Sequence, residues 1–127
     1  MSGPQQSSPS LVLVVEDEGL VRLMAVDMLE DAGFTVIEAS SADEAWTVLQ
    51  SRSDDVGVLF TDIEMPGSMN GFALASRVAE CWPHIRLVLT SGRCRPIACE
   101  VPDHGRFVPK PYLADQLLKA FDQARPI

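Results

Sequence analysis

Short apolar runs alternate with longer amphipathic stretches along most of the chain, and this alternation limits the fold more than any other feature of the sequence. Residues 11–15 are all apolar, and three acidic residues follow them directly. A strand that is covered by helices on both faces has this unbroken apolar pattern. Apolar runs separated by helical patterns are typical of βα units. The sequence therefore predicts an α/β fold built on a parallel sheet.

Four further strands are predicted at residues 34–38, 56–61, 85–90 and 106–108, with helices between most of them. Residues 91–105 are rich in Gly and Pro, so they leave room for only a short or irregular fourth helix. Right-handed crossovers would join the five strands into a doubly wound sheet of order 2-1-3-4-5. The inner faces of the first and last predicted helices are Val21, Met24, Ala25, Met28 and Leu29, and Leu113, Leu117, Ala120, Phe121 and Ala124.

The length of 127 residues suits one domain, which we place at residues 11–127. Residues 1–10, rich in Ser, Pro and Gln, are predicted to be a flexible tail. A net charge of −8, with only ten Lys and Arg spread along the chain, argues against direct binding to nucleic acid. The chain shows neither a membrane-spanning run nor a signal peptide, so a cytoplasmic location without membrane attachment is expected.

Acidic residues follow the first and third predicted strands. A sheet of this order binds ligands beyond the carboxyl ends of these two strands, where the strand order reverses. Glu16, Asp17 and Asp62 are the residues expected there. Crowded carboxylates repel one another, and Mg²⁺ prefers oxygen ligands, so we predict a magnesium site. The alternative for residues 16–18 is a solvated acidic loop that caps the next helix.

Asp62 is also a candidate nucleophile. A carboxylate at the end of a buried strand can attack phosphorus and form an acyl phosphate. Thr90 at the end of the fourth predicted strand and Lys110 after the fifth could hold the phosphoryl oxygens and balance their charge. Taken alone, Asp62 would be better explained as an ordinary loop residue or an Asx-turn. The combination at one sheet edge favours phosphoryl chemistry.

Four motifs lie where predicted strands end. They are Leu-Val-Val-Glu-Asp-Glu at residues 13–18, Thr-Asp-Ile-Glu-Met-Pro-Gly at 61–67, Leu-Thr-Ser-Gly at 89–92 and Val-Pro-Lys-Pro-Tyr at 108–112. As an ordered set, these motifs resemble the CheY-like receiver domains of bacterial response regulators in two-component signalling, and the similarity spans residues 11–124. The resemblance implies a flavodoxin-like fold.

This resemblance implies a role for each motif residue. Asp62 would accept a phosphoryl group, and Thr90 and Lys110 would contact that group once it is attached. Asp17 and Asp62 would bind Mg²⁺ with their side chains and Glu64 with its backbone carbonyl. Glu16, where the family more often has Asp, would act through a metal-bound water. Phe107 would be the switch aromatic, and the peptide between residues 110 and 111 is commonly cis in the family.

The same resemblance implies the partners. The phosphoryl donor would be a histidine kinase or a histidine phosphotransfer protein, and the output would be contact with a further protein. The chain would be a stand-alone receiver and a monomer or weak dimer. It would not be an enzyme beyond phosphorylation and dephosphorylation of its own Asp62.

The same residues leave two alternatives open. A pseudo-receiver would have the same fold but would bind partners independently of phosphorylation. A phosphohydrolase of the haloacid dehalogenase type also uses an Asp nucleophile with Mg²⁺. That class expects a second Asp two residues after the nucleophile, where this chain has Glu64, and it needs a cap domain that does not fit in this length.

Overall fold

The computed structural model describes residues 11–67, 69–93 and 105–124, and in these ranges strands and helices alternate as the apolar pattern predicts. All strand pairs are parallel, and the sheet order β2-β1-β3-β4-β5 confirms the predicted topology. The elements are β1 (Leu11–Val15), α1 (Gly19–Asp31), β2 (Thr35–Ala39), α2 (Ala42–Arg52), β3 (Val58–Asp62), α3 (Gly71–Cys81), β4 (Arg86–Ser91), β5 (Arg106–Pro109) and α4 (Ala114–Gln123).

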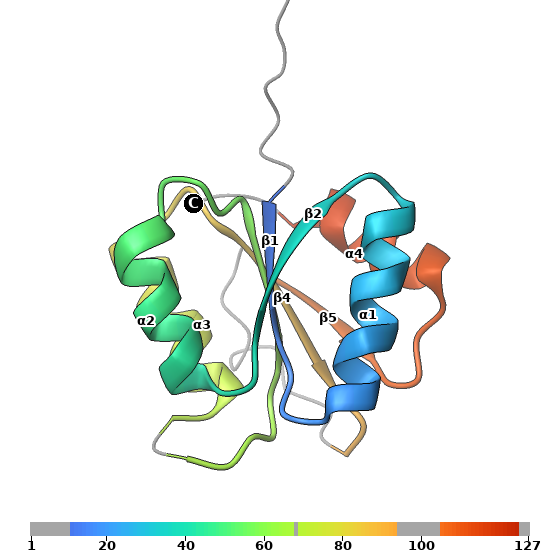
Figure 1. Ribbon diagram of the computed structural model, residues 1–127, viewed down its shortest axis with the longest axis horizontal. Coiled ribbons are helices and arrows are strands. Elements are labelled where there is room, and N and C mark those ends of the chain that lie inside the picture. Colours follow the sequence, from blue (N-terminus) through green and yellow to red (C-terminus); the bar gives the residue numbers. More distant parts are fainter. Residues whose placement is uncertain (1–10, 68, 94–104, 125–127) are drawn as a thin grey trace, which may run out of the picture.

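Helices cover both faces of the sheet, with α2 and α3 on one side and α1 and α4 on the other (Figure 1). Successive residues of one strand point to opposite faces. In β1, Leu13 and Val15 belong to the core cluster under α2 and α3, whereas Val12 and Val14 belong to the cluster under α1 and α4. Both faces of the strand are therefore buried, which explains why its sequence does not alternate.

The third and fourth strands extend one residue further than their apolar runs. The predicted strands end at Thr61 and Thr90, but β3 includes Asp62 and β4 includes Ser91. The reason is the ladder itself, because Asp62 pairs with Thr90 across the two strands and Ser91 pairs with Pro109 of β5. Polar side chains are thus held by regular strand backbone at the carboxyl edge of the sheet.

Two predicted inner-face positions are wrong. Met24 of α1 is 53% exposed and Leu113, the N-cap residue of α4, is 70% exposed. The buried residues of α1 are Ala25, Val26 and Leu29, in the middle and last turns of the helix. Met24 instead lines a surface pocket between α1 and the loop after β5. Met24 lies beside the buried stripe of α1, so helical periodicity identified the apolar residues but not which of them face the sheet.

Several predictions fall outside the described residues. These are the flexible tail at residues 1–10 and most of the irregular segment at 91–105, of which 94–104 are not described. Within the described ranges, no helix combines the length and the apolar character that spanning a membrane requires.

Candidate functional site

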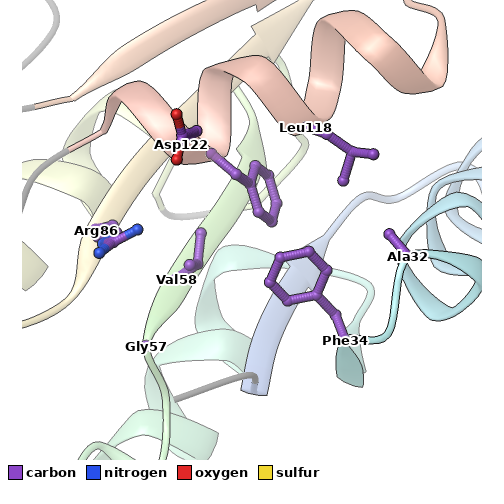
Figure 2. A pocket seen from close by; sticks show the side chains of 8 residues that line it. Ala32, Phe34, Gly57, Val58, Arg86, Leu118 and Asp122 are labelled. Carbon is purple, nitrogen blue, oxygen red and sulfur yellow. The ribbon is translucent and has the colours of Figure 1, made fainter. Parts of the chain in front are cut away.

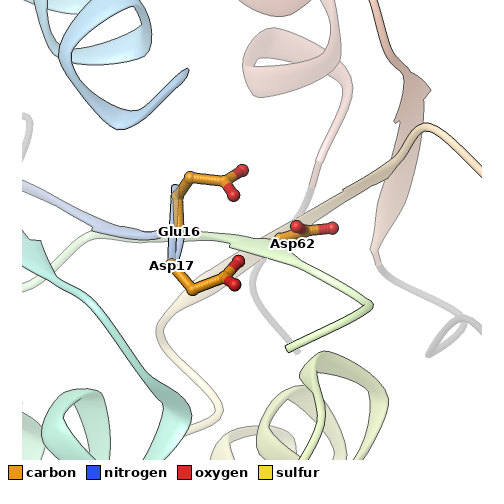
Figure 3. A group of neighbouring side chains, drawn as sticks. All are labelled: Glu16, Asp17 and Asp62. Carbon is orange, nitrogen blue, oxygen red and sulfur yellow. The ribbon is translucent and has the colours of Figure 1, made fainter. Parts of the chain in front are cut away.

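Three carboxylates converge at the carboxyl edge of the sheet (Figure 3). Glu16 and Asp17 come directly after β1, and Asp62 is the last residue of β3. Each offers an oxygen atom within 4.8 Å of the others. They meet because β1 and β3 are parallel neighbours, so that their carboxyl ends lie at the same edge.

Two of these carboxylates are buried. Glu16 is 4% exposed and Asp62 is 5% exposed, whereas Asp17 is exposed to solvent. Burial raises the pKa of Glu16 to about 6, against an opposing hydrogen bond from Lys110. Burial likewise raises the pKa of Asp62, in spite of its hydrogen bond and charge interaction with Lys110. The fold therefore holds two carboxylates where their ionised forms are unfavourable without added positive charge.

Lys110 supplies part of that charge. Its Nζ donates to Glu16 Oε1 at 2.7 Å and to Asp62 Oδ2 at 3.1 Å. Burial alone would lower the pKa of Lys110, but these two hydrogen bonds and the charges of both carboxylates outweigh burial and raise it. Lys110 follows β5, and its peptide bond to Pro111 is cis, as the family resemblance implies. The ammonium lies between the two carboxylates.

Thr90 lies beside Asp62, since the two residues are partners in the β3–β4 ladder. The side chain is 2% exposed, and its Oγ1 atom has no hydrogen-bond partner in the described part of the chain. A buried hydroxyl without a partner is costly, and such groups call for an explanation such as a ligand. Its position at the strand end suits a hydroxyl that contacts an oxygen atom of a bound group.

Glu64 and Ser91 form a second contact across the same edge. The Ser91 hydroxyl lies 2.7 Å and 2.6 Å from the two carboxylate oxygens of Glu64 and donates to them. The Glu64 backbone N–H donates to Asp62 Oδ1 at 3.3 Å. The sequence resemblance concerns the carbonyl of Glu64, and it does not indicate that the side chain is held by Ser91.

Phe107 is the remaining residue with an expected role. It lies on β5, where it pairs with Leu89 of β4. Its side chain is partly buried and packs against the core cluster under α2 and α3. The switch role assigned by resemblance stays a prediction.

The model of the family described as "Response regulator receiver domain" matches residues 12–122. This chain belongs to that family. Among curated proteins, a chemotaxis protein CheY homolog of Campylobacter jejuni is 32% identical and the match covers 85% of each chain. The sensor kinase CckA of Brucella abortus is 33% identical over 87% of this chain. The dicarboxylate transport regulator DctD of Rhizobium meliloti is 35% identical over 93% of it.

The chain matches only 12% of the length of that sensor kinase and 25% of that of the transport regulator. Among solved structures, the receiver domain of the hybrid histidine kinase CckA is 27% identical, with a TM-score of 0.74 over 90% of this chain and 97% of the other. Vibrio cholerae CheY4 has a TM-score of 0.77 at 24% identity, over 90% and 97% of the two chains, which supports the fold.

Gly71 allows α3 to begin close to the backbone of Asp62. It is the first residue of α3, and its N–H donates to the carbonyl of Ile63 at 3.0 Å. A side chain at this position would collide with the backbone carbonyl of Asp62. Glycine therefore lets the start of α3 lie directly against the end of β3.

Arg22 is a residue of this site that the sequence interpretation missed. It lies in α1 and contacts the backbone of the acidic loop after β1. A cation close to a helix N-terminus opposes the helix dipole, so it needs acidic partners. That signal was present in the sequence, because Glu16, Asp17 and Glu18 immediately precede the helix.

A cavity of about 370 Å³ lies at the opposite edge of the receiver domain (Figure 2). Val58 and Arg86, the first residues of β3 and β4, line it, so it is separated from Asp62 by the length of the sheet. Phe34 and Phe121 form an edge-on ring contact in its wall, with centroids 5.5 Å apart. This cavity contains none of the candidate site residues.

Proposed function

We propose that the protein is the phosphoacceptor of a two-component phosphorelay, and that Asp62 takes its phosphoryl group from a phosphohistidine. The observation that carries the proposal is the surroundings of Asp62. Its carboxylate is buried beside the Lys110 ammonium, the unpartnered hydroxyl of Thr90 and two further carboxylates. This arrangement combines a nucleophile with groups that can bind phosphoryl oxygens and a cation.

In the proposed reaction, an oxygen of Asp62 attacks the phosphorus of the donor. The new bond is an acyl phosphate, the bond between phosphorus and the donor's imidazole nitrogen breaks, and its electron pair stays on that nitrogen. Lys110 then holds a phosphoryl oxygen by a charge-assisted hydrogen bond, and the Thr90 hydroxyl donates to another. Phe107, next to these strands in β5, would respond when Thr90 engages the phosphoryl group.

The oxygen ligands present fit Mg²⁺, which prefers carboxylates and carbonyls. Asp17 and Asp62 would bind it with their side chains, Glu64 with its backbone carbonyl and Glu16 through a water. When bound, the cation offsets the negative charge that gathers between the carboxylates and the phosphoryl oxygens. Burial raises the pKa values of Glu16 and Asp62, and a bound cation would favour the ionised forms of both carboxylates.

The surface beside the site suits a protein donor. Leu20 and Leu23 of α1 are 72% and 53% exposed, and Leu113 after the Lys110 loop is 70% exposed. A small pocket lined by Met24 and Pro111 lies between these two segments. Exposed apolar side chains gathered in this way are typical of protein docking sites. A histidine kinase or a histidine phosphotransfer protein would dock here on the receiver domain, which we place at residues 11–127.

Intact mass after incubation with acetyl phosphate and Mg²⁺ tests the acceptor chemistry. One added phosphoryl group is expected on the wild-type protein, and none on Asp62→Asn or in the presence of EDTA. No addition on the wild type, together with no Mg²⁺ binding by calorimetry, would favour a phosphorylation-independent pseudo-receiver.

The nature of the donor is tested with the variant Leu20→Ser/Leu23→Ser. Both side chains are exposed, so the fold should tolerate the change. Phosphorylation by a phosphorylated histidine kinase should slow at least tenfold, whereas phosphorylation by acetyl phosphate should stay within twofold of the wild type. Equal slowing with both donors would show that this surface does not dock the kinase.

A further inference from the structure

The guanidinium of Arg22 links the acidic loop to β2. Its Nη1 donates to the backbone carbonyl of Glu16 at 2.7 Å, and its Nε donates to Glu38 Oε1 at 3.0 Å. The Arg22 side chain is 23% exposed. Its contact with the Glu16 carbonyl is partly buried, whereas its contact with Glu38 is exposed. One side chain therefore bonds to the end of β1 and to a residue of the neighbouring strand.

The carbonyl that Arg22 binds belongs to the peptide between Glu16 and Asp17. On the other side of Glu16, its own N–H donates to the carbonyl of Ala39 at 3.1 Å, which continues the β1–β2 ladder. Beyond this point the ladder ends, so the Glu16 carbonyl depends on Arg22 for its hydrogen bond. Because the peptide unit is planar, its orientation influences the direction in which the Asp17 side chain points.

In the described part of the chain, no contact of its own holds the Asp17 side chain in place. Its carboxylate is exposed and makes no hydrogen bond or ion pair with any residue in the described ranges. By contrast, Glu16 is held by Lys110 and by the N–H of Glu18. The position of the Asp17 carboxylate therefore depends on the backbone, and that backbone is fixed by Arg22.

We propose that Arg22 is a positioning residue for the metal site, which preorganises Asp17 through the Glu16 carbonyl. This inference rests on the proposed function, because it assigns a role toward the same Mg²⁺ site. Groups that orient metal ligands without touching the metal commonly change affinity tenfold or more when they are removed. Arg22 acts on the backbone of a ligand rather than on its side chain.

Electrostatics alone predicts the opposite result. A guanidinium near a cation site repels the cation, so removal of its charge should tighten Mg²⁺ binding. Loss of the hydrogen bond to the Glu16 carbonyl should weaken Mg²⁺ binding, because Asp17 would no longer be held in place. The sign of the change in affinity therefore distinguishes positioning from charge.

The test is the Mg²⁺ affinity of Arg22→Met, measured by isothermal titration calorimetry on the full chain. We expect the dissociation constant to rise about tenfold. Two control variants should remain within twofold of the wild type. Glu38→Gln keeps an acceptor for Arg22. Arg52→Met removes an exposed arginine that pairs with Asp55 and that is the last residue of α2.

A second readout separates positioning from a general loss of structure. The rate of phosphorylation by acetyl phosphate is measured against Mg²⁺ concentration. Arg22→Met should need about tenfold more Mg²⁺ for half-maximal rate and reach nearly the wild-type plateau. Unchanged or tighter Mg²⁺ binding, or a lower plateau at unchanged half-saturation, would overturn the inference. Failure of the wild type itself to bind Mg²⁺ would instead refute the proposed function.

Discussion

The two edges of the sheet differ in what they bury. The five buried polar residues in the described ranges are all at the carboxyl edge, namely Glu16, Thr61, Asp62, Thr90 and Ser91. At the amino edge, the buried side chains are apolar, and the charged groups of Arg86 and Asp122 are exposed around the cavity. Burial of apolar groups at the amino edge stabilises the fold, whereas burial of ionisable groups at the carboxyl edge lowers its stability.

This difference shows how a small domain can carry a charged site. Strand β1 is entirely apolar, whereas β3 ends in Thr61 and Asp62 and β4 ends in Thr90 and Ser91. Regular backbone pairing therefore holds these polar side chains in place. Packing elsewhere must offset the cost of burying carboxylates, since a domain has only about 5–15 kcal/mol of net stability. Substitutions at the two edges should therefore have different effects on stability and on Mg²⁺ binding.

The largest effect is expected from Phe121→Ala at the amino edge. Phe121 is 3% exposed and contacts the rings of Phe34 and Phe60 at 5.5 Å and 5.8 Å. Its removal should lower the free energy of unfolding by about 4 kcal/mol, because it enlarges a cavity that is already present. Urea denaturation measures the loss, and calorimetry should show Mg²⁺ affinity within twofold of the wild type. A tenfold change in that affinity would mean that the two edges are coupled.

Lys110→Met tests the carboxyl edge. In EDTA at pH 7.5, the free energy of unfolding should fall by about 3 kcal/mol, because two buried carboxylates lose their shared cation. Saturating Mg²⁺ should restore much of the loss, whereas Mg²⁺ would not rescue Phe121→Ala. Lys119→Met, at an exposed position of α4, is the matched control and should change stability by less than about 0.5 kcal/mol. Equal losses for the two lysine variants would argue against the ion pairs of Lys110.

The pH dependence of stability isolates Glu16. Burial raises the pKa of this carboxyl to about 6 from an ordinary 4.5, so the folded state holds more protons than the unfolded state between these values. The free energy of unfolding due to Glu16 should therefore fall by about 2 kcal/mol as the pH rises through this window without metal. The difference between wild type and Glu16→Gln in urea denaturation measures it. A wild-type protein that gains stability relative to Glu16→Gln over this window would contradict the assignment.

The sequence predicts much of this site because each strand ends at its predicted last residue or one residue later. Each polar residue that follows a run, such as Asp62 or Thr90, must lie at the carboxyl edge once the sheet is parallel. The family motifs add a role to each position. Assigning these roles requires only the order of the strands and the residue at each strand end, and it requires no side-chain geometry.

Side-chain contacts across the edge do not follow from that order. The hydrogen bond from Ser91 to Glu64 joins residues 27 positions apart, and both belong to quoted motifs that indicate no such contact. The contact of Arg22 with the Glu16 carbonyl depends on how α1 leaves the acidic loop. Exposure of Met24 depends on which side of α1 faces the sheet, and exposure of Leu113 depends on where α4 begins. These features are set by three-dimensional packing, which periodicity does not describe.

The smallest effect is expected from Asp62→Asn, and its sign is informative. Burial raises the pKa of Asp62, so the ionised form is disfavoured in the metal-free fold. A neutral amide removes that cost and also relieves repulsion with Glu16, while Lys110 keeps its 2.7 Å contact with Glu16. In EDTA the variant should be more stable by about 1 kcal/mol, or a melting temperature about 4 °C higher. Calorimetric melting with EDTA and with Mg²⁺ checks this, and Asp55→Asn, on the exposed surface, is the control. If Asp62→Asn were instead destabilising in EDTA, the carboxylate would be a structural partner of Lys110 rather than a strained acceptor, and the contrast between the two edges would lose its functional meaning.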